Sequence, residues 1–405
     1  MKIKEKINFI LQHKTAIFLP IICFLHFLAC FYYDFWIVAT VFSVLLLVIS
    51  DFSNMLYYMI FFQMFSASGK FSVITTFTFI ALVGIKYLYG IISKKEKFYA
   101  GPFFITLLIC VVYSSFAYQR DSLGVYQGWS LIAAFAIIYL IFTYKDKFKL
   151  RKCADFLVGG ILASAFISLF ILLVNDSNIS IFSSIGASLK RIKLLTNNEN
   201  SLAIYCSLAL SYYVYAIINK QGNLFKNIVF GLSVIPFGLS TLSKCFLIIC
   251  IIIFVYLILM IIIRYKTHAL AFIIPIILML AIIGVGFKST VVATIQRFVT
   301  PYGDSIISSL TTGRSDLWTA YINEITSSIP KMLFGVGFFN ARLVDRGPHN
   351  LLLHLAYRMG FVGIILIGVL IYLYQKNSSK PFKLTIKNCL PLITFLLISL
   401  VEGFL

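Results

Sequence analysis

A histidine stands where a long polar stretch of the chain meets an apolar run. His349 is one of only five histidines, and it lies in Gly347-Pro348-His349-Asn350, directly before the apolar residues that follow. Proline favours the first position of a helix, so we expect His349 in the first turn. There the helix dipole disfavours the imidazolium and leaves a neutral ring that can accept a proton. This placement suits a general base acting on a hydroxyl, and it also fits a histidine that only bonds a loop carbonyl.

Five cations in the same predicted outer segments could bind an anionic group. They are Arg191, Lys244, Arg314, Arg342 and Arg346. The planar fork of arginine binds phosphate oxygens bidentately and stays charged, and such charge stabilises a diphosphate leaving group. Each arginine alone is equally explained by a solvated face or a lipid headgroup contact. Lys244 differs, because it interrupts an apolar context where a charge is costly unless it is paired or lines a polar cavity.

Two further residues belong to a second tier of candidates, Asn350 beside the histidine and Arg358. Arg358 lies roughly 13 Å along the predicted helix from His349, and it either snorkels to the interface or points into the same cavity. His354 lies roughly 140° around that helix from His349, so the two histidines form no metal pair. The outer segments also lack clustered carboxylates. We therefore predict a site without a metal ion or other cofactor.

The elements that hold these residues are predicted to be membrane helices. The 405 residues are 60% hydrophobic and 12% charged, whereas a soluble domain has about 25% charged residues. A lipid-spanning β-barrel would show alternating segments of about ten residues, but the apolar runs here are continuous, and the eight cysteines mostly lie within them. The sequence predicts an all-α polytopic membrane protein with about 12–13 transmembrane helices. The predicted spans are 15–33, 35–50, 52–66, 71–92, 101–118, 128–144, 155–174, 200–218, 227–243, 245–263, 269–287, 351–374 and 386–404.

Basic residues set the expected topology. With the amino terminus inside, 20 of the 34 lysines and arginines fall in inside segments, as the positive-inside rule requires. The formal charge of +20 could suggest nucleic-acid binding, but the charges are scattered through short loops rather than clustered on one face. Two long outer loops, 175–199 and 288–350, are more basic than the rule predicts. Either long loops escape the rule or their charge attracts an anionic group.

The outer loop 288–350 has a predicted structure of its own. The segment from Arg314 to Ser328 is predicted to be a helix. Its apolar residues recur at helical spacing and form an apolar stripe with the following isoleucine: Trp318, Ile322, Ile325 and Ile329. Pro330 is expected to end this helix, which would lie along the membrane interface. A glycine-rich turn, 335–337, follows.

The order of these pieces resembles the signature of the O-antigen ligase/polymerase superfamily. The pieces are Gly313-Arg314-Ser315-Asp316-Leu317-Trp318, then Pro330, Leu333-Phe334-Gly335-Val336-Gly337, His349-Asn350 and Gly360-Phe361-Val362-Gly363. Two earlier pieces also look like that family. One is Arg191 followed by Asn198-Glu199-Asn200-Ser201-Leu202-Ala203. The other is Leu239-Ser240-Thr241-Leu242-Ser243-Lys244. Lys244 stands where the family usually has arginine. Lysine keeps the positive charge but lacks the planar guanidinium fork. The resemblance covers residues 191–363, and it suggests amino-terminal helices over 1–174 and a ligase/polymerase-like core over 175–405.

The resemblance implies a glycosyltransferase that acts at the outer leaflet of the bacterial cytoplasmic membrane. Such enzymes move a glycan from undecaprenyl diphosphate to an acceptor hydroxyl, with membrane lipids around them and a chain-length regulator as a further partner. The family pattern makes His349 the base and Arg191 and Arg314 the foremost diphosphate ligands, with Lys244, Arg342 and Arg346 supporting them. Nucleic acid is not an expected partner.

Three functions stay open at this point. A polymerase would extend a lipid-linked repeat unit, and the sequence Leu333-Phe334-Gly335-Val336-Gly337 favours it. A ligase would transfer the glycan to a lipid A core. A flippase or other transporter would usually carry ionisable residues near the membrane midplane and inverted repeats, and before residue 350 Lys86 and His26 are nearly the only such groups within the predicted spans.

Overall fold

The computed structural model describes residues 3–116, 122–174, 182–185, 189–266, 269–299, 314–340, 343, 347–378, 385 and 389–401. Within these residues the chain is almost entirely helical, as predicted, with one two-stranded hairpin. It forms two compact units, each built from two separate stretches of sequence. Unit 1 comprises residues 1–86 and 146–294, and unit 2 comprises residues 87–145 and 295–405. The division predicted at residue 174 followed the resemblance, whereas the contacts divide the chain differently.

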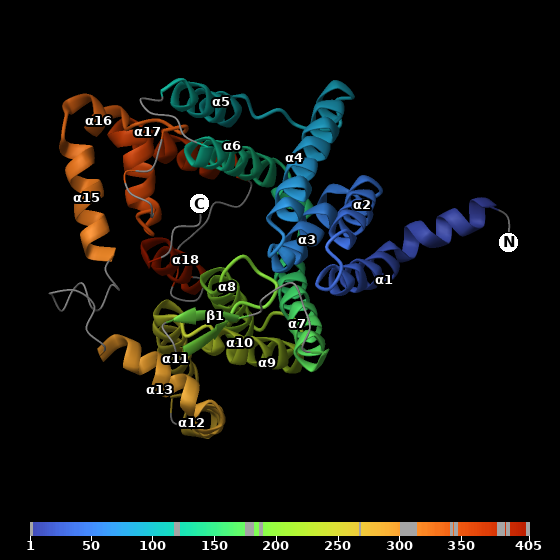
Figure 1. Ribbon diagram of the computed structural model, residues 1–405, viewed down its shortest axis with the longest axis vertical. Helices are drawn as coiled ribbons and strands as arrows, with labels where there is room; N and C mark the ends of the chain where they lie inside the picture. The colour runs from blue at the N-terminus through green and yellow to red at the C-terminus, as the bar shows by residue number, and fades with distance from the viewer. Residues whose placement is uncertain are drawn as a thin grey trace. The chain divides into compact units, whose positions relative to one another are not determined.

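Unit 1 contains α1 to α3, most of α4, and the elements from α7 to the first half of α13 (Figure 1). Its bounds are α1 Ile3–Ala29, α2 Phe35–Val48, α3 Phe52–Phe62, η1 Gln63–Phe65, α4 Gly69–Ile92, α7 Leu150–Val174, β1 Phe182–Ile185, β2 Leu189–Ile192, α8 Glu199–Ile218, α9 Leu224–Ser233, α10 Ile235–Ser240, α11 Lys244–Tyr265, α12 Ala269–Gly286 and α13 Lys288–Val299. Helix α3 packs on α7, and α8 packs on α9 and α11.

Unit 2 contains the end of α4 and the elements from α5 to α6, and from α15 to α18. Their bounds are α5 Ala100–Ser115, α6 Ser122–Thr143, α15 Arg314–Thr326, α16 Ile329–Phe334, α17 Leu351–Lys376 and α18 Leu390–Val401, with the short turn η2 Lys145–Lys147 at the unit boundary. Helix α17 contacts α5, α15 and α16. The core that α17 shares with α5 and α6 includes Tyr113, Phe135, Phe338 and Met359, all of them buried.

Seven helices in the described chain are long and apolar enough to cross a membrane, which supports the predicted polytopic membrane protein. They are Leu11–Ala29, Gly69–Ile92, Gly124–Thr143, Leu150–Val174, Glu199–Ile218, Lys244–Arg264 and Leu351–Lys376. Four shorter apolar helices match further predicted spans, namely Phe35–Val48, Ala100–Ser115, Leu224–Ser240 and Leu390–Ser399. Polar caps fix where several helices begin, because the side chains of Asp51, Asn198, Asn223, Ser243 and Asn350 each accept a bond from an amide of the first turn.

The helix ends group as the predicted topology requires. In unit 1, Lys14 donates to the Ile49 carbonyl at 3.0 Å, and the Lys149 amide donates to the Tyr57 hydroxyl at 2.8 Å. These contacts join ends that were all predicted to lie inside. Lys86, predicted within a span, reaches the Ser50 carbonyl at 2.5 Å and so places its charge at this same end.

Contacts at the other end of unit 1 join segments that were all predicted to lie outside. The Ala67 amide donates to the Leu195 carbonyl at 2.7 Å, and the Lys70 ammonium lies 5.8 Å from the centre of the Trp36 ring. In unit 2 the Lys145 ammonium donates to the Asn377 carbonyl at 3.0 Å, which joins two predicted inside ends. Each unit is therefore internally consistent with the predicted alternation of sides.

The structure has three local features that were not predicted. The predicted span 227–243 consists of two consecutive helices, α9 and α10, and Pro236 lies in the first turn of the second. Helix α15 ends before Pro330, as predicted, but Pro330 also lies in the first turn of a further short helix, α16. The hairpin of β1 and β2, in which Phe182 pairs with Ile192, was not predicted within loop 175–199.

Candidate active site

A glycine turn in unit 2 packs its backbone directly against a kink in α17. The helix is interrupted at Gly360, whose φ is 59° and ψ is −166°. An interruption of this kind releases carbonyl groups from the helical pattern. The amides of Val336 and Gly337 donate to the carbonyls of Tyr357 and Arg358, each at 2.9 Å. The turn and the kink therefore form one hydrogen-bonded unit.

Both sides of this contact require glycine. Gly335 has a φ of 70°, and a Cβ there would lie 2.5 Å from the backbone carbon of Arg358. A Cβ on Gly360 would lie 2.5 Å from the backbone of Leu333 and Gly335. Positive φ and backbone contact both exclude larger side chains. The two glycine pieces that were noted in the sequence are thus the two faces of one close packing contact.

Arg358 is the buried charge at the centre of this contact. Its side chain is only 1% exposed, so it does not snorkel to the interface. One guanidinium nitrogen donates to the carbonyls of Gly337 and Asn340, at 3.3 and 2.6 Å, and the other donates to Gln127 at 2.7 Å. A buried charge is tolerated where hydrogen bonds such as these, made by both terminal nitrogens, offset its burial. Arg358 therefore fixes the turn 335–340 and the start of α6 around α17.

His349 lies immediately before α17 in an unusual backbone conformation. The prediction that it sits in the first helical turn was wrong, because the helix begins at Leu351 with Asn350 as its N-cap. Asn350 accepts a bond from the Leu353 amide at 3.0 Å, a role that asparagine fills better than histidine. His349 itself has a φ of 49° and is half-buried. Non-glycine residues adopt positive φ uncommonly, histidine among the more tolerant ones, and such conformations gather at functional sites.

A hydrogen bond links α15 to the loop residue directly before His349. The indole nitrogen of Trp318 donates to the Pro348 carbonyl at 2.8 Å, directly before His349. Arg314 is the first residue of α15 and lies one helical turn, about 5.4 Å, before Trp318. The side chains at these positions share one face of the helix. The structure thus places Arg314 one helical turn from the tryptophan that bonds the loop directly before His349 and Asn350.

Helix α15 packs on α17 through a residue that was not part of the predicted stripe. Tyr321 is 1% exposed and meets Tyr357 with ring centres 4.9 Å apart. Ile325 packs against the same cluster, whereas Ile322 and Ile329 are exposed. In Figure 1, α15, α16 and α17 lie side by side. The helix is therefore anchored to unit 2 by an aromatic pair, and part of the predicted apolar stripe remains uncovered.

Arg191 in unit 1 is bonded to groups of its own chain. It is buried, with 6% of its surface exposed. Its guanidinium pairs with the Glu199 carboxylate, donates to Asn200 at 2.9 Å, and donates to the Thr241 carbonyl at 2.6 Å. The pieces 198–203 and 239–244, noted separately in the sequence, thus meet at Arg191. Sequence reasoning missed Glu199 as the partner of Arg191, although the carboxylate lay within a quoted motif.

Lys244 lies next to this cluster as the first residue of α11. Ser243 caps the helix by accepting from the Phe246 amide at 3.4 Å, and Lys244 is half-buried. A lysine at a helix start opposes the helix dipole. Arg191 and Lys244 belong to unit 1, whereas Arg314, His349 and Arg358 belong to unit 2. Arg342 and Arg346 lie outside the described residues.

Two further observations bear on the chemistry that these residues allow. His354, on α17, is buried at 6% exposure, so His349 is the more accessible of the two histidines. Within the part of the chain that the structure describes, no three histidine, cysteine, aspartate or glutamate side chains are grouped so that they could hold a metal ion. Proton transfer by histidine and charge stabilisation by arginine are the chemistry that the unit 2 residues can supply.

Comparison of the chain with models of protein families, with curated proteins and with solved structures finds no match. A functional assignment therefore rests on the order and spacing of the sequence motifs and on the contacts that several of them make in the structure.

Proposed function

We propose that the chain is a membrane glycosyltransferase that polymerises oligosaccharide repeat units carried on undecaprenyl diphosphate. In this proposal the site lies at the outer leaflet of the bacterial cytoplasmic membrane. His349 accepts the proton of the acceptor hydroxyl, and Arg314 stabilises negative charge on the diphosphate as its bond to the sugar breaks. No metal ion takes part.

The arrangement around His349 is the observation that carries the proposal. A half-buried histidine with positive φ is held between the cap of α17 and the Trp318 bond from α15, and Arg314 begins that same helix. Strain of this kind is expected where a side chain must be aimed at a substrate. The family resemblance supplies the reaction, and the motif residues 314–318, 333–337, 349–350 and 360–363 all belong to unit 2.

Arg191 takes a changed part in this proposal. A guanidinium that already pairs with Glu199 and Asn200 is poorly suited to bind a second anion. We assign it a positioning role, in which it joins the segments 191–200 and 239–244 and thereby sets the position of Lys244. Lys244 then remains the candidate diphosphate ligand of unit 1, while Arg342 and Arg346 remain candidates in the outer loop.

A glycan ladder from cells that carry His349→Ala tests the proposal. A polymerase defect leaves single repeat units on the acceptor, whereas a ligase defect leaves long chains on the carrier lipid. A transport defect leaves repeat units facing the cytoplasm and no outer product of any length. His13→Ala is the matched control, since His13 is an exposed histidine near the predicted inside end of α1. A normal ladder in His349→Ala cells would rule out the catalytic assignment.

A further inference from the structure

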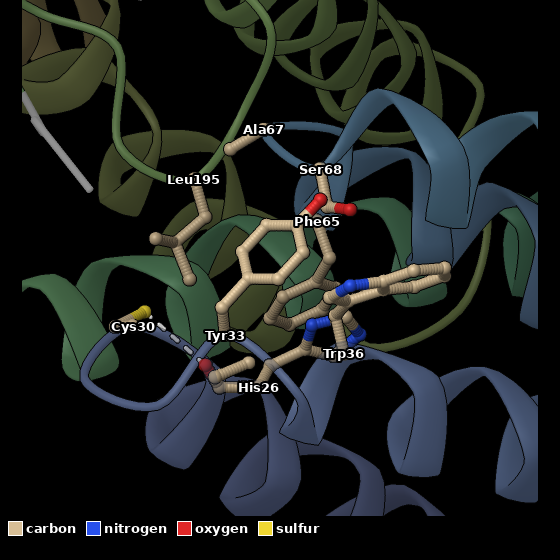
Figure 2. Close-up of a pocket in the computed structure, with 9 residues that line it drawn as sticks. His26, Cys30, Tyr33, Trp36, Phe65, Ala67, Ser68 and Leu195 are labelled. Atoms are coloured by element: carbon tan, nitrogen blue, oxygen red, sulfur yellow. Dashed lines mark hydrogen bonds between the residues drawn. The ribbon is translucent and has the colours of Figure 1, made fainter. Parts of the chain in front are cut away.

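A pocket in unit 1 belongs to neither of the cation groups described above. Its volume is about 230 Å³. Pockets for drug-sized ligands measure about 300–1,000 Å³, so this one suits a single ring or headgroup. Figure 2 shows side chains of α1, α2, η1 and the following turn gathered around it, together with Leu195 from the segment after β2.

The pocket lies at the end of unit 1 that was predicted to face outside. The Ala67–Leu195 hydrogen bond closes one side, and the Asn197 amide donates to Ser66 at 3.1 Å beside it. Tyr33, another lining residue, is 58% exposed. A ligand arriving from the outer membrane surface would therefore meet this pocket directly.

Two lining side chains carry buried nitrogen atoms that the described protein does not satisfy. Within the described residues, neither Nε2 of His26 nor Nε1 of Trp36 has a hydrogen-bond partner, and both atoms are shielded from solvent. Leaving a buried polar group unsatisfied costs free energy. His26 is only 6% exposed, and its ring stacks on Phe65 with centres 4.6 Å apart. These two atoms differ from other unsatisfied buried atoms of the described chain in that both residues line one pocket, where a ligand would supply the missing bonds.

The chemistry of the two nitrogens restricts what can fill the pocket. The indole N–H of Trp36 only donates, so the ligand must offer an acceptor oxygen, and the imidazole nitrogen of His26 can either donate or accept. Hydroxyl groups satisfy both requirements. The aromatic walls of Tyr33, Trp36 and Phe65 suit the carbon-bound hydrogens of a saturated ring. A sugar ring combines an apolar face with hydroxyl groups at its rim and fits all of these features.

We propose that this pocket binds one sugar ring of a membrane-associated glycan, whose hydroxyl groups bond Trp36 Nε1 and His26 Nε2. The source of the sugar rests on the proposed function, which makes it part of the lipid-linked substrate or of the growing chain. Both nitrogens are shielded in this structure, so binding requires the rings of Trp36 and His26 to turn toward the ligand. The Lys70 ammonium, over the Trp36 ring, lies where it attracts an acidic sugar or a neighbouring phosphate.

Tryptophan fluorescence of the full-length protein in nanodiscs of fixed phospholipid composition tests this proposal. The probes are free glucose, galactose, N-acetylglucosamine, rhamnose and glucuronate. At least one is expected to give a saturable change, because Trp36 is one of only three tryptophans and contacts the ligand. Trp36→Phe should abolish the change, whereas Trp129→Phe, a matched substitution at an exposed tryptophan of unit 2, should retain it.

His26→Phe separates binding from folding. Phenylalanine keeps the stacking on Phe65 but removes the unsatisfied nitrogen, so the thermal midpoint should stay the same or rise. Sugar affinity, measured by saturation-transfer NMR, should fall at least tenfold. His349→Ala should bind sugar normally, so a failure of the transfer prediction is distinguishable from a failure of this one.

Three results would overturn the proposal. The first is the absence of saturable binding for every sugar in the panel. The second is unchanged binding in both Trp36→Phe and His26→Phe. The third is a fluorescence change that follows the phospholipid headgroup in vesicles of varied composition and ignores the sugars, which would make the pocket a lipid site.

Discussion

Arg358 and Arg191 show how buried arginines in this chain serve the fold. Each has its guanidinium bonded by carbonyl oxygens and polar side chains from segments far apart in the sequence. A cation buried in this way organises the backbone around it, because the hydrogen bonds that offset its burial come from carbonyl groups of that backbone. His349 differs, since it is half-buried and its backbone conformation is held by its neighbours. At the residue scale, the histidine is therefore the candidate for chemistry and the two arginines are positioning residues.

Arg358→Ala is expected to destabilise unit 2 strongly. The substitution leaves the carbonyls of Gly337 and Asn340 and the Gln127 side chain without their donor, at a cost on the order of 3 kcal/mol. The measurement is thermal unfolding of the purified protein in detergent. Arg264→Ala is the control, because Arg264 is exposed and donates to a backbone carbonyl, that of Ile218. Equal unfolding midpoints for the two variants would contradict this role of Arg358.

Asn350→Ala should reduce transfer activity more than stability. Loss of an N-cap costs about 1 kcal/mol, yet this cap also fixes the start of α17 directly after His349. Asn350→Asp keeps an acceptor for the Leu353 amide and should preserve both properties. The comparison needs the turnover rate of each variant at a temperature where all are folded. An aspartate variant as inactive as the alanine variant would indicate a direct chemical role for the amide.

At the scale of elements, the kinked α17 is the part on which the candidate site depends. It carries the cap beside His349, the buried Arg358 and the Gly360 interruption, and it contacts α5, α15 and α16. The kink lets the 335–337 turn bond to the helix backbone, so the helix and the turn hold each other. A straight helix would lack the carbonyl acceptors that this turn uses.

Gly360→Ala should disrupt this arrangement, whereas Gly368→Ala should not. Alanine at Gly360 would need a φ of 59° and would place its Cβ 2.5 Å from backbone atoms of Leu333 and Gly335. Gly368 lies in the same helix with nothing within 4 Å of the added Cβ, and alanine there should be neutral or stabilising by up to about 1 kcal/mol. Thermal midpoints and transfer rates of both variants provide the check. Tolerance of alanine at both positions would contradict the packing role of Gly360.

The elements could be predicted where one continuous apolar run decides the structure. The predicted span 351–374 corresponds to Leu351–Lys376, and 155–174 corresponds to Leu150–Val174. The prediction failed where something other than a continuous apolar run determines the local structure. The hairpin depends on the pairing of two short neighbouring strands, as between Phe182 and Ile192, and such pairing leaves no apolar run in the sequence. Pro236 and Pro330 were treated as parts or ends of helices, although proline also favours the first turn of a new one.

The sequence predicted which residues belong to the candidate site better than it predicted which groups they bond. The sequence indicated Arg314, His349 and Asn350, and the structure places all three in unit 2, with α15 bonded to the residue before His349. It could not indicate that Arg191 pairs with Glu199, because each charge alone is compatible with solvent, a ligand or a partner. The role of Arg358 was also open, since its position along a helix does not tell which turn packs over it.

At the scale of the whole molecule, the distribution of charge and the grouping of helix ends agree within each unit. Contacts such as Lys14 with Ile49 and Lys145 with Asn377 join ends of one predicted side. Contacts such as Ala67 with Leu195 join ends of the other. The positive-inside rule assigns the first group to the cytoplasm, and the proposed function needs the second group outside.

Cysteine labelling of intact cells tests this orientation. Cysteines introduced at Lys193 and Ser327 should react with a membrane-impermeant maleimide. Cysteines at Lys94 and Asn377, two exposed positions at predicted inside ends, should react only after permeabilisation. The parent protein is the control, because its eight cysteines are expected to react little. The opposite labelling pattern would reverse the topology and place the candidate site in the cytoplasm.

Transfer by the purified, reconstituted protein measures the central claim most directly. The substrate is a lipid-diphosphate-linked repeat unit, and the product is the lengthened glycan. Removal of a general base typically lowers a rate about 10²–10⁴-fold, so His349→Ala should lose activity to that extent while its unfolding midpoint stays unchanged. Addition of a chelator should leave the wild-type rate intact. A His349→Ala protein that elongates the glycan at the wild-type rate would contradict the account.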